Sequence, residues 1–495
     1  MPSRAWQPLL AVIALALATS LWLATSFPLI DPDEGRNAEV AREMAERFDP
    51  VIPHLAGMPY LDKPPALFWT AAAAICALGP RPLAARLPAI LAACLTLLVL
   101  ARGALREADA GFALRVVALT AAAPLFAIIS AYVIFDMPLT LCITVAWTAL
   151  ARELSVGPSA RRRTAMFLAL ALGTLIKGPV MLAWGLGGSL AAALLLRRRS
   201  PLGWLAWWPG WLMVLALAGG WFALATVRHP EYPRYAFLEE SIERLTSGSF
   251  HREQPWWFVP AVLVGGAFPW SLASPWLALR KPARNRAAST DGPEPGVASG
   301  PTGLAVALGF VLFAAVFFTL SRSKLVTYLL PALPPLAWLA AAAWGRVALP
   351  LRRGGVIAMV LVTPLGLVLG RPALLAYARS QSGAGLAEAI RQSGGGVVRY
   401  EACYSPGTDY LLGRRGDLID GGGEVTTSNY QLRYRGTLVA RGLWTAREGV
   451  PGAADTVTDA AVRVRAASRA EDPPPGWREI HRDVRFVAYR RIARY

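Results

Sequence analysis

Three carboxylates lie within four residues in the segment Asp31-Pro-Asp33-Glu34. The segment directly follows the first long apolar run, so these acids would stand at a membrane surface. Like charges at this spacing cost free energy unless a cation, a metal or a substrate compensates them. A carboxylate placed there can act as a general base on an acceptor hydroxyl or phosphate. The alternative is structural, because Asp31 or Asp33 could cap a helix that starts near Glu34.

The same loop carries a lysine beside two prolines, in the run Asp62-Lys63-Pro64-Pro65. Prolines hold this stretch of chain extended and rigid, and a fixed ammonium at a membrane surface suits a phosphate group. The alternative is a lysine that only reaches from the interface to water. The other polar side chains of the loop that we assign to substrate binding are Glu34, Arg36, His54, Tyr60 and Asp62.

Further ionisable residues stand at the ends of other apolar runs, where they are expensive and usually functional. An anionic ligand at this face would explain their convergence, whereas salt bridges between loops could explain any single one. These residues are Asp136, Lys177, His251, Arg252, Lys324 and Tyr328.

The composition decides the class of protein. The chain has 495 residues, of which 55% are hydrophobic and only 17% charged, and its mean hydropathy is +0.41. Apolar runs near 20 residues recur along it, so we predict a mainly α-helical polytopic membrane protein. The net charge of +18 comes from arginine clusters between these runs, a pattern typical of loops on the cytoplasmic face rather than of nucleic-acid binding. No P-loop, GxSxG or HExxH pattern is present, which disfavours ATP-driven transport and hydrolysis.

The apolar runs predict about eleven crossings, and no more than thirteen. The run Ala66–Leu78 has about 13 residues, too few to cross a bilayer core of about 30 Å. If it lies on the outer surface, all the main arginine clusters fall on the side of the N-terminus, as the positive-inside rule requires. We predict the other spans at Leu9–Leu29, Leu83–Leu100, Phe112–Ser130, Met137–Ala151, Thr164–Pro179, Val180–Leu196, Trp204–Val227, Phe258–Leu279, Leu304–Leu320, Val326–Trp344 and Val356–Gly370.

Two domains follow from this pattern. Residues 1–370 form a transmembrane catalytic domain with outer loops at 31–82 and 228–257, and residues 371–495 form a small soluble α/β domain. In the tail, short β-like runs predict strands at Val397–Tyr400, Leu438–Arg441, Val462–Arg465 and Val484–Arg490, and a helix at Leu386–Gln392.

The ordered set of motifs resembles the lipid A aminoarabinose transferases and, more widely, the GT-C glycosyltransferases that include the protein O-mannosyltransferases. The resemblance covers the membrane region. Its residues are Asp33-Glu34-Gly-Arg36-Asn-Ala-Glu39, Val51-Ile-Pro53-His54-Leu-Ala-Gly57, Asp62-Lys63-Pro64-Pro65, Phe135-Asp136-Met-Pro138, Ile176-Lys177-Gly178, His251-Arg252-Glu-Gln-Pro255-Trp256-Trp257 and Lys324-Leu-Val-Thr-Tyr328.

This resemblance implies an inverting transfer of a sugar from a polyprenyl phosphate, at the periplasmic face of a bacterial inner membrane, with the N-terminus in the cytoplasm. The sugar would be 4-amino-4-deoxy-L-arabinose and the acceptor lipid A. Asp33 matches the family's catalytic candidate and Asp136 its second membrane-edge acid. Lys63, Arg252 and Tyr328 match positions that would hold the lipid phosphate.

The sequence departs from the family at Asn37, where tyrosine is common, and at Asp62, where glutamate is frequent. Both departures bear on sugar preference. We predict no required cofactor, although Asp33, Glu34 and His54 have ligand types that a divalent ion accepts.

Other functional hypotheses are consistent with the same residues. A protein, a polysaccharide or another envelope lipid could replace lipid A as the acceptor. A transporter of lipid-linked sugars would use the cations for binding alone, but transporters often show internal repeats, and none is visible here.

Overall fold

The computed structural model describes residues 2–243, 253–279, 300–345, 349–420, 425–448, 461–469 and 472–492. The chain divides into two compact units. The helical unit comprises Met1–Leu23 and Ala89–Leu369, and the mixed unit comprises Ala24–Pro88 and Gly370–Tyr495. One change between the units falls between Leu369 and Gly370. The first outer loop, however, belongs with the C-terminal domain and not with the membrane helices, because hydrogen bonds join the two, as shown below.

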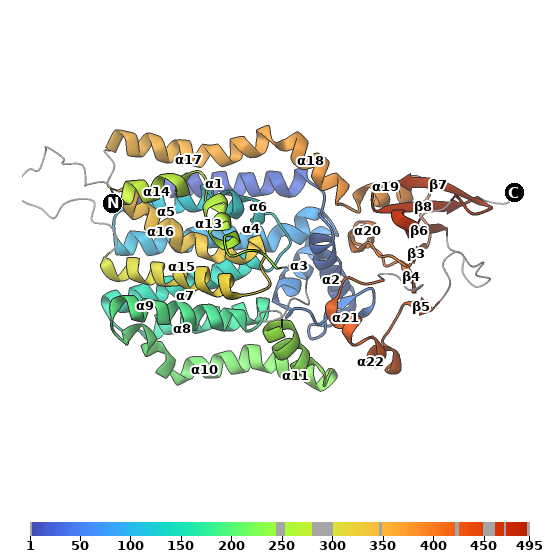
Figure 1. Cartoon of the computed structure of the whole chain (residues 1–495), viewed down its shortest axis with the longest axis horizontal. Coiled ribbons are helices and arrows are strands. Elements are labelled where there is room, and N and C mark those ends of the chain that lie inside the picture. Colours follow the sequence, from blue (N-terminus) through green and yellow to red (C-terminus); the bar gives the residue numbers. More distant parts are fainter. Residues whose placement is uncertain are drawn as a thin grey trace, which may run out of the picture. The chain divides into compact units, whose positions relative to one another are not determined.

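The helical unit is a bundle whose long helices run side by side (Figure 1). Its α-helices, of which α1 and α4 continue into the mixed unit, are α1 (Pro2–Ser26), α4 (Pro82–Glu107), α5 (Ala110–Ala122), α6 (Pro124–Ile129), α7 (Asp136–Val156), α8 (Ala160–Lys177), α9 (Val180–Leu196), α10 (Trp208–Val214), α11 (Gly220–Arg228), α13 (Phe258–Gly266), α14 (Trp270–Leu279), α15 (Pro301–Leu320), α16 (Leu333–Trp344) and α17 (Leu349–Leu369). Four 3₁₀ or π segments join them, η1 (Ser200–Ala206), η2 (Leu215–Gly219), η3 (Arg234–Glu243) and η4 (Val326–Ala332).

Six helical segments of the described chain are long and apolar enough to cross a membrane, and a bent pair ending at Ser380 would make a seventh. Helices α3 (Ala66–Leu78), α5 and α9 are apolar but shorter. The chain is thus a multi-pass membrane protein. The count of about eleven crossings stays a prediction, and so does the surface position of α3, whose bounds the sequence placed correctly.

Two predicted spans are broken. The run 112–130 is interrupted at Ala123, whose backbone is extended (φ −67°, ψ 119°) because the next residue is Pro124. The run 258–279 divides into α13 and α14 at residues 267–269. The run 204–227 starts in the 3₁₀ segment η1 and then continues through α10, η2 and α11 as one helical span, Trp208–Arg228. Hydrophobic length alone could not reveal these interruptions.

The core of the helical unit is aromatic where α5, α7 and α16 meet. The Trp338 ring packs edge-on against Phe112 and Trp147, with centroids 5.1 and 5.2 Å apart. Nearby, the buried Arg115 donates from Nε to the Ala341 carbonyl at 2.9 Å. Helices α9 and α15 approach closely at Gly309, where a Cβ would lie 2.7 Å from the Ala192 nitrogen.

The mixed unit contains the sheet that the tail predicted, of order β5-β4-β3-β6-β8-β7. Strands β3 to β6 pair in parallel, and β8 pairs antiparallel with both β6 and β7. Its strands are β1 (His54–Leu55), β2 (Met58–Pro59), β3 (Val398–Glu401), β4 (Asp417–Asp420), β5 (Arg447–Glu448), β6 (Val462–Ala466), β7 (Trp477–Arg482) and β8 (Phe486–Arg491). Its helices are α2 (Asp33–Arg47), α3, α18 (Arg371–Ser380), α19 (Ala384–Gln392), α20 (Pro406–Leu412), α21 (Asn429–Arg433), α22 (Arg435–Ala440) and the 3₁₀ turn η5 (Ala467–Arg469).

One predicted strand is wrong. The run 438–441 lies at the end of α22, where the Leu438 nitrogen donates to the Tyr434 carbonyl four residues earlier. Leu438 is buried while Val439 is exposed, a pattern that a short helix and a short strand share. The predictions for the runs 397–400, 462–465, 484–490 and 386–392 are confirmed by β3, β6, β8 and α19.

A buried ion pair fixes the start of α4 to the start of α2. Arg86 donates from Nε and Nη2 to the two carboxylate oxygens of Glu34, at 2.8 and 2.6 Å. The remaining donors of Arg86 reach the carbonyls of Ala24, Phe27 and Pro28. Both charges are almost entirely withdrawn from water, so each depends on the other.

We expect Glu34→Gln to destabilise the mixed unit strongly. The substitution leaves the Arg86 charge buried and uncompensated, which costs about 3–5 kcal/mol. Thermal unfolding of the purified chain in detergent measures the loss. Glu479→Gln is the matched control, because it removes the same charge from an exposed pair with Arg482 and should leave the melting temperature almost unchanged. Equal melting temperatures for both variants would show that the buried pair contributes nothing.

Candidate active site

Helix α2 begins at Asp33, and its N-cap residue, Pro32, makes no side-chain cap. Neither Asp31 nor Asp33 therefore caps the helix, and the structural alternative raised by the sequence is wrong. Instead, the Asp31 nitrogen donates to the Gln381 carbonyl at 2.9 Å. Gly35 allows close contact here, since a Cβ on it would lie 1.7 Å from Asp31 Oδ1.

The three carboxylates of this segment have different partners. Asp31 is buried and receives Arg485 Nη2 at 2.9 Å and, more weakly, the Ser405 hydroxyl at 3.4 Å. Burial raises the pKa of Asp31, against the lowering effect of Arg485. Glu34 is held by Arg86, as described above, which gives it a structural role. Asp33 alone keeps a substantial part of its side chain in solvent, 41%, against 2% for Asp31 and none for Glu34.

Asp33 is oriented by Arg36, one helical turn further along α2. Arg36 Nη2 lies 2.6 Å from Asp33 Oδ1, and Nη1 donates to the Thr427 carbonyl at 3.1 Å. Burial alone would lower the pKa of Arg36, but Tyr60, Asp33 and Asp62 together raise it above its usual value. Among the described residues, Arg36 Nε has no hydrogen-bond partner. The guanidinium thus stays charged and holds one donor in reserve.

Asp62 contacts the C-terminal domain. Its two carboxylate oxygens accept from the backbone nitrogens of Asn429 and Tyr430, at 3.1 and 2.7 Å. These nitrogens belong to the first turn of α21, where backbone donors lack helical partners and attract negative charge. Asp62 therefore fixes α21 to the loop and positions the adjacent Lys63.

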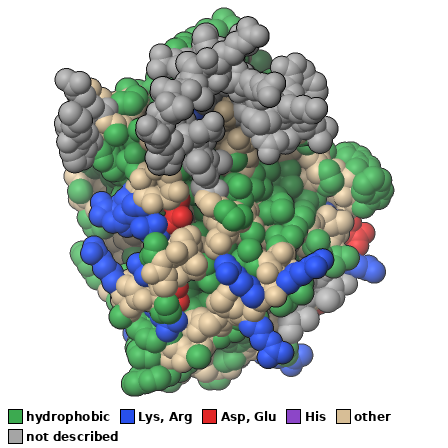
Figure 2. Space-filling view, turned by 90° about the vertical axis from the view of Figure 1, so that its left-hand side faces the viewer, with side chains coloured by type: hydrophobic (Ala, Val, Ile, Leu, Met, Phe, Trp, Pro, Cys, Tyr) green, Lys and Arg blue, Asp and Glu red, His purple; other side chains and the backbone are tan. Residues whose placement is uncertain are grey.

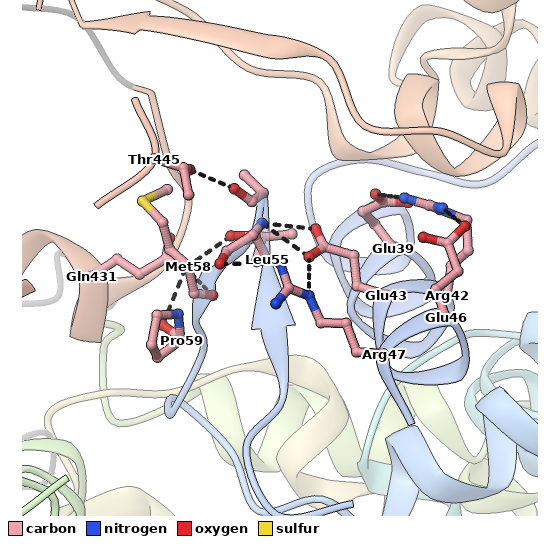
Figure 3. A network of polar contacts seen from close by, with 12 residues as sticks. Glu39, Arg42, Glu43, Glu46, Arg47, Leu55, Met58, Pro59, Gln431 and Thr445 are labelled. Atoms are coloured by element: carbon pink, nitrogen blue, oxygen red, sulfur yellow. Dashed lines mark hydrogen bonds and ion pairs between the residues drawn. The ribbon is translucent and has the colours of Figure 1, made fainter. Parts of the chain in front are cut away.

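The C-terminal domain also holds the short hairpin β1–β2. Gln431 Nε2 donates to the carbonyls of Leu55, Met58 and Pro59, each within 3.2 Å (Figure 3). Thr445 Oγ1 donates to the Ala56 carbonyl at 2.6 Å. Sequence reasoning missed Gln431 and Thr445, and no local signal could have found them, because their partners are backbone carbonyls about 370 to 390 residues away.

The remaining loop residues take different positions. Tyr60 is buried, with its ring edge-on to Phe68 at 5.8 Å. His54 lies half-buried in β1, and Lys63 is half-buried just after Asp62. The mixed unit therefore places Asp33, Tyr60 and Asp62 close enough to Arg36 to influence its charge.

The helical unit contains a second group of predicted residues. Lys177, at the end of α8, lies 2.5 Å through Nζ from Oδ1 of Asp136, the first residue of α7. The same ammonium stands 4.3 Å from the centre of the Tyr328 ring in η4. The structure thus brings these three predicted residues together.

Lys324 has a neighbouring but separate role. It is buried, and its Nζ donates to the Gln254 carbonyl at 3.0 Å. A bridge between Glu253 and Ser323 joins the same two segments. Lys324 therefore anchors the segment that follows His251 and Arg252, two predicted residues that lie outside the described part of the chain.

A buried acidic cluster lies beside the site residues on α2. Glu39 forms a bidentate pair with Arg42, at 2.7 and 2.6 Å, and Glu43 accepts the Gly57 nitrogen at 2.9 Å (Figure 3). From α20, Asp409 accepts the Tyr400 hydroxyl at 2.8 Å and the Gly416 nitrogen at 3.0 Å. Burial raises the pKa of Asp409 to about 7, and it also raises the pKa values of Glu39 and Glu43.

Within the described residues, no group of three His, Cys, Asp or Glu side chains is arranged to hold a metal ion. Glu34 in particular is committed to Arg86. The expectation that no cofactor is required stays a prediction.

The chain is similar to proteins of known activity. The family model of the dolichyl-phosphate-mannose-protein mannosyltransferases matches residues 7–227. The undecaprenyl phosphate-alpha-4-amino-4-deoxy-L-arabinose arabinosyl transferase of Pseudomonas paraeruginosa is 31% identical over 345 residues, or 68% of this chain and 59% of that protein. Its counterpart from Pseudomonas aeruginosa is 32% identical over 320 residues, or 62% and 54%. The chain spans somewhat more than half the length of these relatives.

Two crystal structures share the fold across nearly the whole chain. ArnT from Cupriavidus metallidurans bound to undecaprenyl phosphate has a TM-score of 0.79, with 22% identity and 97% of both chains covered. The apo state of that protein gives a TM-score of 0.75, with 22% identity, and covers 99% of this chain and 98% of the other. The chain therefore has the same fold as these two ArnT structures.

In sequence, the chain is similar to the aminoarabinose transferases, of whose length it spans less than two thirds.

The acidic cluster generates a prediction about pH. Folded Asp409 holds its proton up to about pH 7, whereas the ordinary value is 3.8. Its contribution to stability is therefore complete below the ordinary pKa and is lost as the pH rises through about 7. We expect the free energy of unfolding, and with it the melting temperature, to fall between about pH 4 and 7, with a slope of up to roughly 1.4 kcal/mol per pH unit for one proton, and to level off above about pH 7.

Asp409→Asn should flatten this step, because the amide cannot lose a proton. Asp417→Asn, in β4 of the mixed unit, is the control and should keep the wild-type slope. A melting temperature that rises over this range in the unaltered chain would contradict the assignment.

Proposed function

We propose that the chain is an inverting glycosyltransferase that transfers 4-amino-4-deoxy-L-arabinose from undecaprenyl phosphate to lipid A. The reaction takes place at the periplasmic face of the bacterial inner membrane, with the N-terminus in the cytoplasm and the C-terminal domain in the periplasm. Support for the donor and the acceptor comes from the similarity to the arabinosyl transferases and from the site residues.

The observation that carries the proposal is the solvent exposure of the Asp33 carboxylate and its pairing with Arg36. Of the three acids at the start of α2, it alone has a solvent-exposed carboxylate, and its one charged partner is oriented by Thr427. Such a carboxylate can accept a proton from an acceptor hydroxyl. If the acceptor is a lipid A phosphate, already an anion near pH 7, Asp33 instead positions it, and Arg36 offers its reserved donor.

We assign the binding of the donor's lipid phosphate to cationic side chains. In the helical unit, Lys177 is held by Asp136 and Tyr328, so its ammonium is fixed before any substrate arrives. In the mixed unit, Lys63 is placed by the attachment of Asp62 to α21. Fixed cations stabilise a leaving phosphate because they need no reorganisation during the reaction. We assign Arg252 and His251 to the same task from the sequence resemblance.

A protein acceptor is the second candidate. It is favoured by the match of residues 7–227 to the protein mannosyltransferase family. The chemistry at Asp33 would then be general-base catalysis on a serine or threonine hydroxyl.

Asp33→Asn should reduce sugar transfer by at least about 100-fold, because the amide neither accepts a proton nor orients Arg36 as a carboxylate does. The measurement is mass spectrometry of lipid A from a Gram-negative host that lacks its own aminoarabinose transferase and expresses the chain or a variant. A pentosamine-sized mass increment with the unaltered chain reports transfer.

Glu46→Gln is the matched control, since it removes an exposed carboxylate from the other end of α2 and should keep transfer. An increment that persists with Asp33→Asn would remove Asp33 from the mechanism. No increment with the unaltered chain, when the chain is folded and the donor is present, would overturn lipid A as the acceptor and direct the search to glycoproteins.

We expect the double variant Asp136→Asn/Lys177→Gln to raise the Kd for undecaprenyl phosphate at least about tenfold, since a charge-assisted phosphate contact is lost. Removing both charges avoids an orphaned buried carboxylate, so the melting temperature should change little. Binding is measured by titration of the purified chain. Glu153→Gln/Arg163→Gln removes another ion pair of the helical unit, at 2.9 Å, and should leave the Kd unchanged. A tenfold effect in both double variants would mean that the loss is not specific to Lys177.

A further inference from the structure

Figure 2 shows the end of the helical unit at which the N-terminus lies, and Lys and Arg side chains gather on it. Part of this charge surrounds a hollow of about 500 Å³ between α4, α7 and α8. The positive-inside rule explains why arginines are on one side of a membrane, but not why they surround a cavity. The proposed transfer makes no use of this site.

The lining of the hollow is strongly cationic. Five arginines contribute to it and only one acid, Glu107. Glu107 is paired with Arg152, whose Nη1 lies 3.1 Å from its Oε1. The other four arginines of the lining are Arg102, Arg106, Arg161 and Arg162. Arg106 lies within the electric field of all four other arginines, so their repulsion is only partly compensated by the protein.

Two buried donors of the lining have no acceptor among the described residues, Trp147 Nε1 and Arg162 Nε. A buried N–H without a partner costs free energy that a bound acceptor would recover. The unmet groups are both donors, and the excess charge is positive. Both observations favour an anion with several oxygen atoms.

The apolar walls of the hollow indicate which kind of molecule carries the anionic group. Val99, Val145 and Ala165 are among the apolar residues of the lining, and Trp147 and Trp338 also contribute. A hollow that combines guanidinium groups with apolar walls at the end of membrane-spanning helices fits a phosphate attached to a lipid. A fully hydrated free anion would gain nothing from these walls.

We propose that the hollow between α4, α7 and α8 is a binding site for the phosphate headgroup of an anionic membrane lipid. Arg102 and Arg106 approach from α4, while Arg152 from α7 and Arg161 and Arg162 from α8 complete the ring. The site is distinct from Asp33 and Lys177 and does not depend on the proposed transfer.

Native mass spectrometry of the full chain in detergent tests the proposal, with phosphatidylglycerol as the probe and phosphatidylcholine as the zwitterionic comparison. The test variant is Arg102→Gln/Arg106→Gln, because both side chains are exposed and can be changed without uncovering a buried charge. The matched control is Arg197→Gln/Arg199→Gln, which removes two exposed arginines from the same end, outside the hollow.

We expect the test variant to bind phosphatidylglycerol about fivefold or more weakly, and the control to change by less than about twofold. Phosphatidylcholine should bind weakly to all three proteins. Equal losses in the two double variants, or no loss in either, would overturn the site and leave only a general attraction of the basic end for anionic lipid.

Competition with inorganic phosphate identifies the source of the anion. If millimolar phosphate leaves phosphatidylglycerol bound, the lipid headgroup is the ligand, as we propose. If phosphate displaces the lipid from the unaltered chain but not from the residual sites of the test variant, the hollow binds the free anion and the assignment to a lipid is wrong.

Discussion

Charge taken out of water must find a partner, and this constraint shapes the start of α2. The first loop brings three acids to the end of an apolar helix, and burial would make each of them costly. The fold supplies Arg86 to Glu34 and Arg485 to Asp31. Asp33 remains the one acid with access to solvent, paired with an arginine that has a donor to spare. The carboxylate that we propose to react is thus distinguished by the partners that the fold supplies to its two neighbours.

The partners explain why the first loop and the C-terminal domain form one unit. Arg485 comes from the turn before β8, Gln431 and the backbone nitrogens that bind Asp62 come from α21, and Thr427 precedes it. The role of these groups is structural and needs no chemical reaction. They set the position of the hairpin β1–β2, of Asp62 and of Arg36, and a loop of this length without them would have many conformations. The C-terminal domain therefore acts as a support for the site residues of the loop.

The sequence was sufficient to select candidate site residues, whose roles stay predictions. Asp33, Asp136 and Lys177 stood out because charge near a membrane is expensive and needs a reason, and Tyr328 because it lies beside such charges. Helix α3 and strands β3 and β6 followed from length and composition. Interactions between distant segments were not accessible, such as Arg86 with Glu34 or Gln431 with the hairpin, since nothing local marks them. Breaks inside apolar runs were missed because hydrophobicity persists through a proline.

Cationic side chains have three kinds of surroundings in this chain. Arg86 and Arg42 have full carboxylate partners and hold structure together. Lys177 has one carboxylate and an aromatic ring, which fix the ammonium without burying it completely. The arginines around the hollow share a single acid, so the protein leaves most of their charge unmatched. A cation with a complete set of partners has no need of a ligand, whereas cations that outnumber their partners favour one. The ratio of cations to acids, more than their number, therefore distinguishes a structural arginine from a binding site.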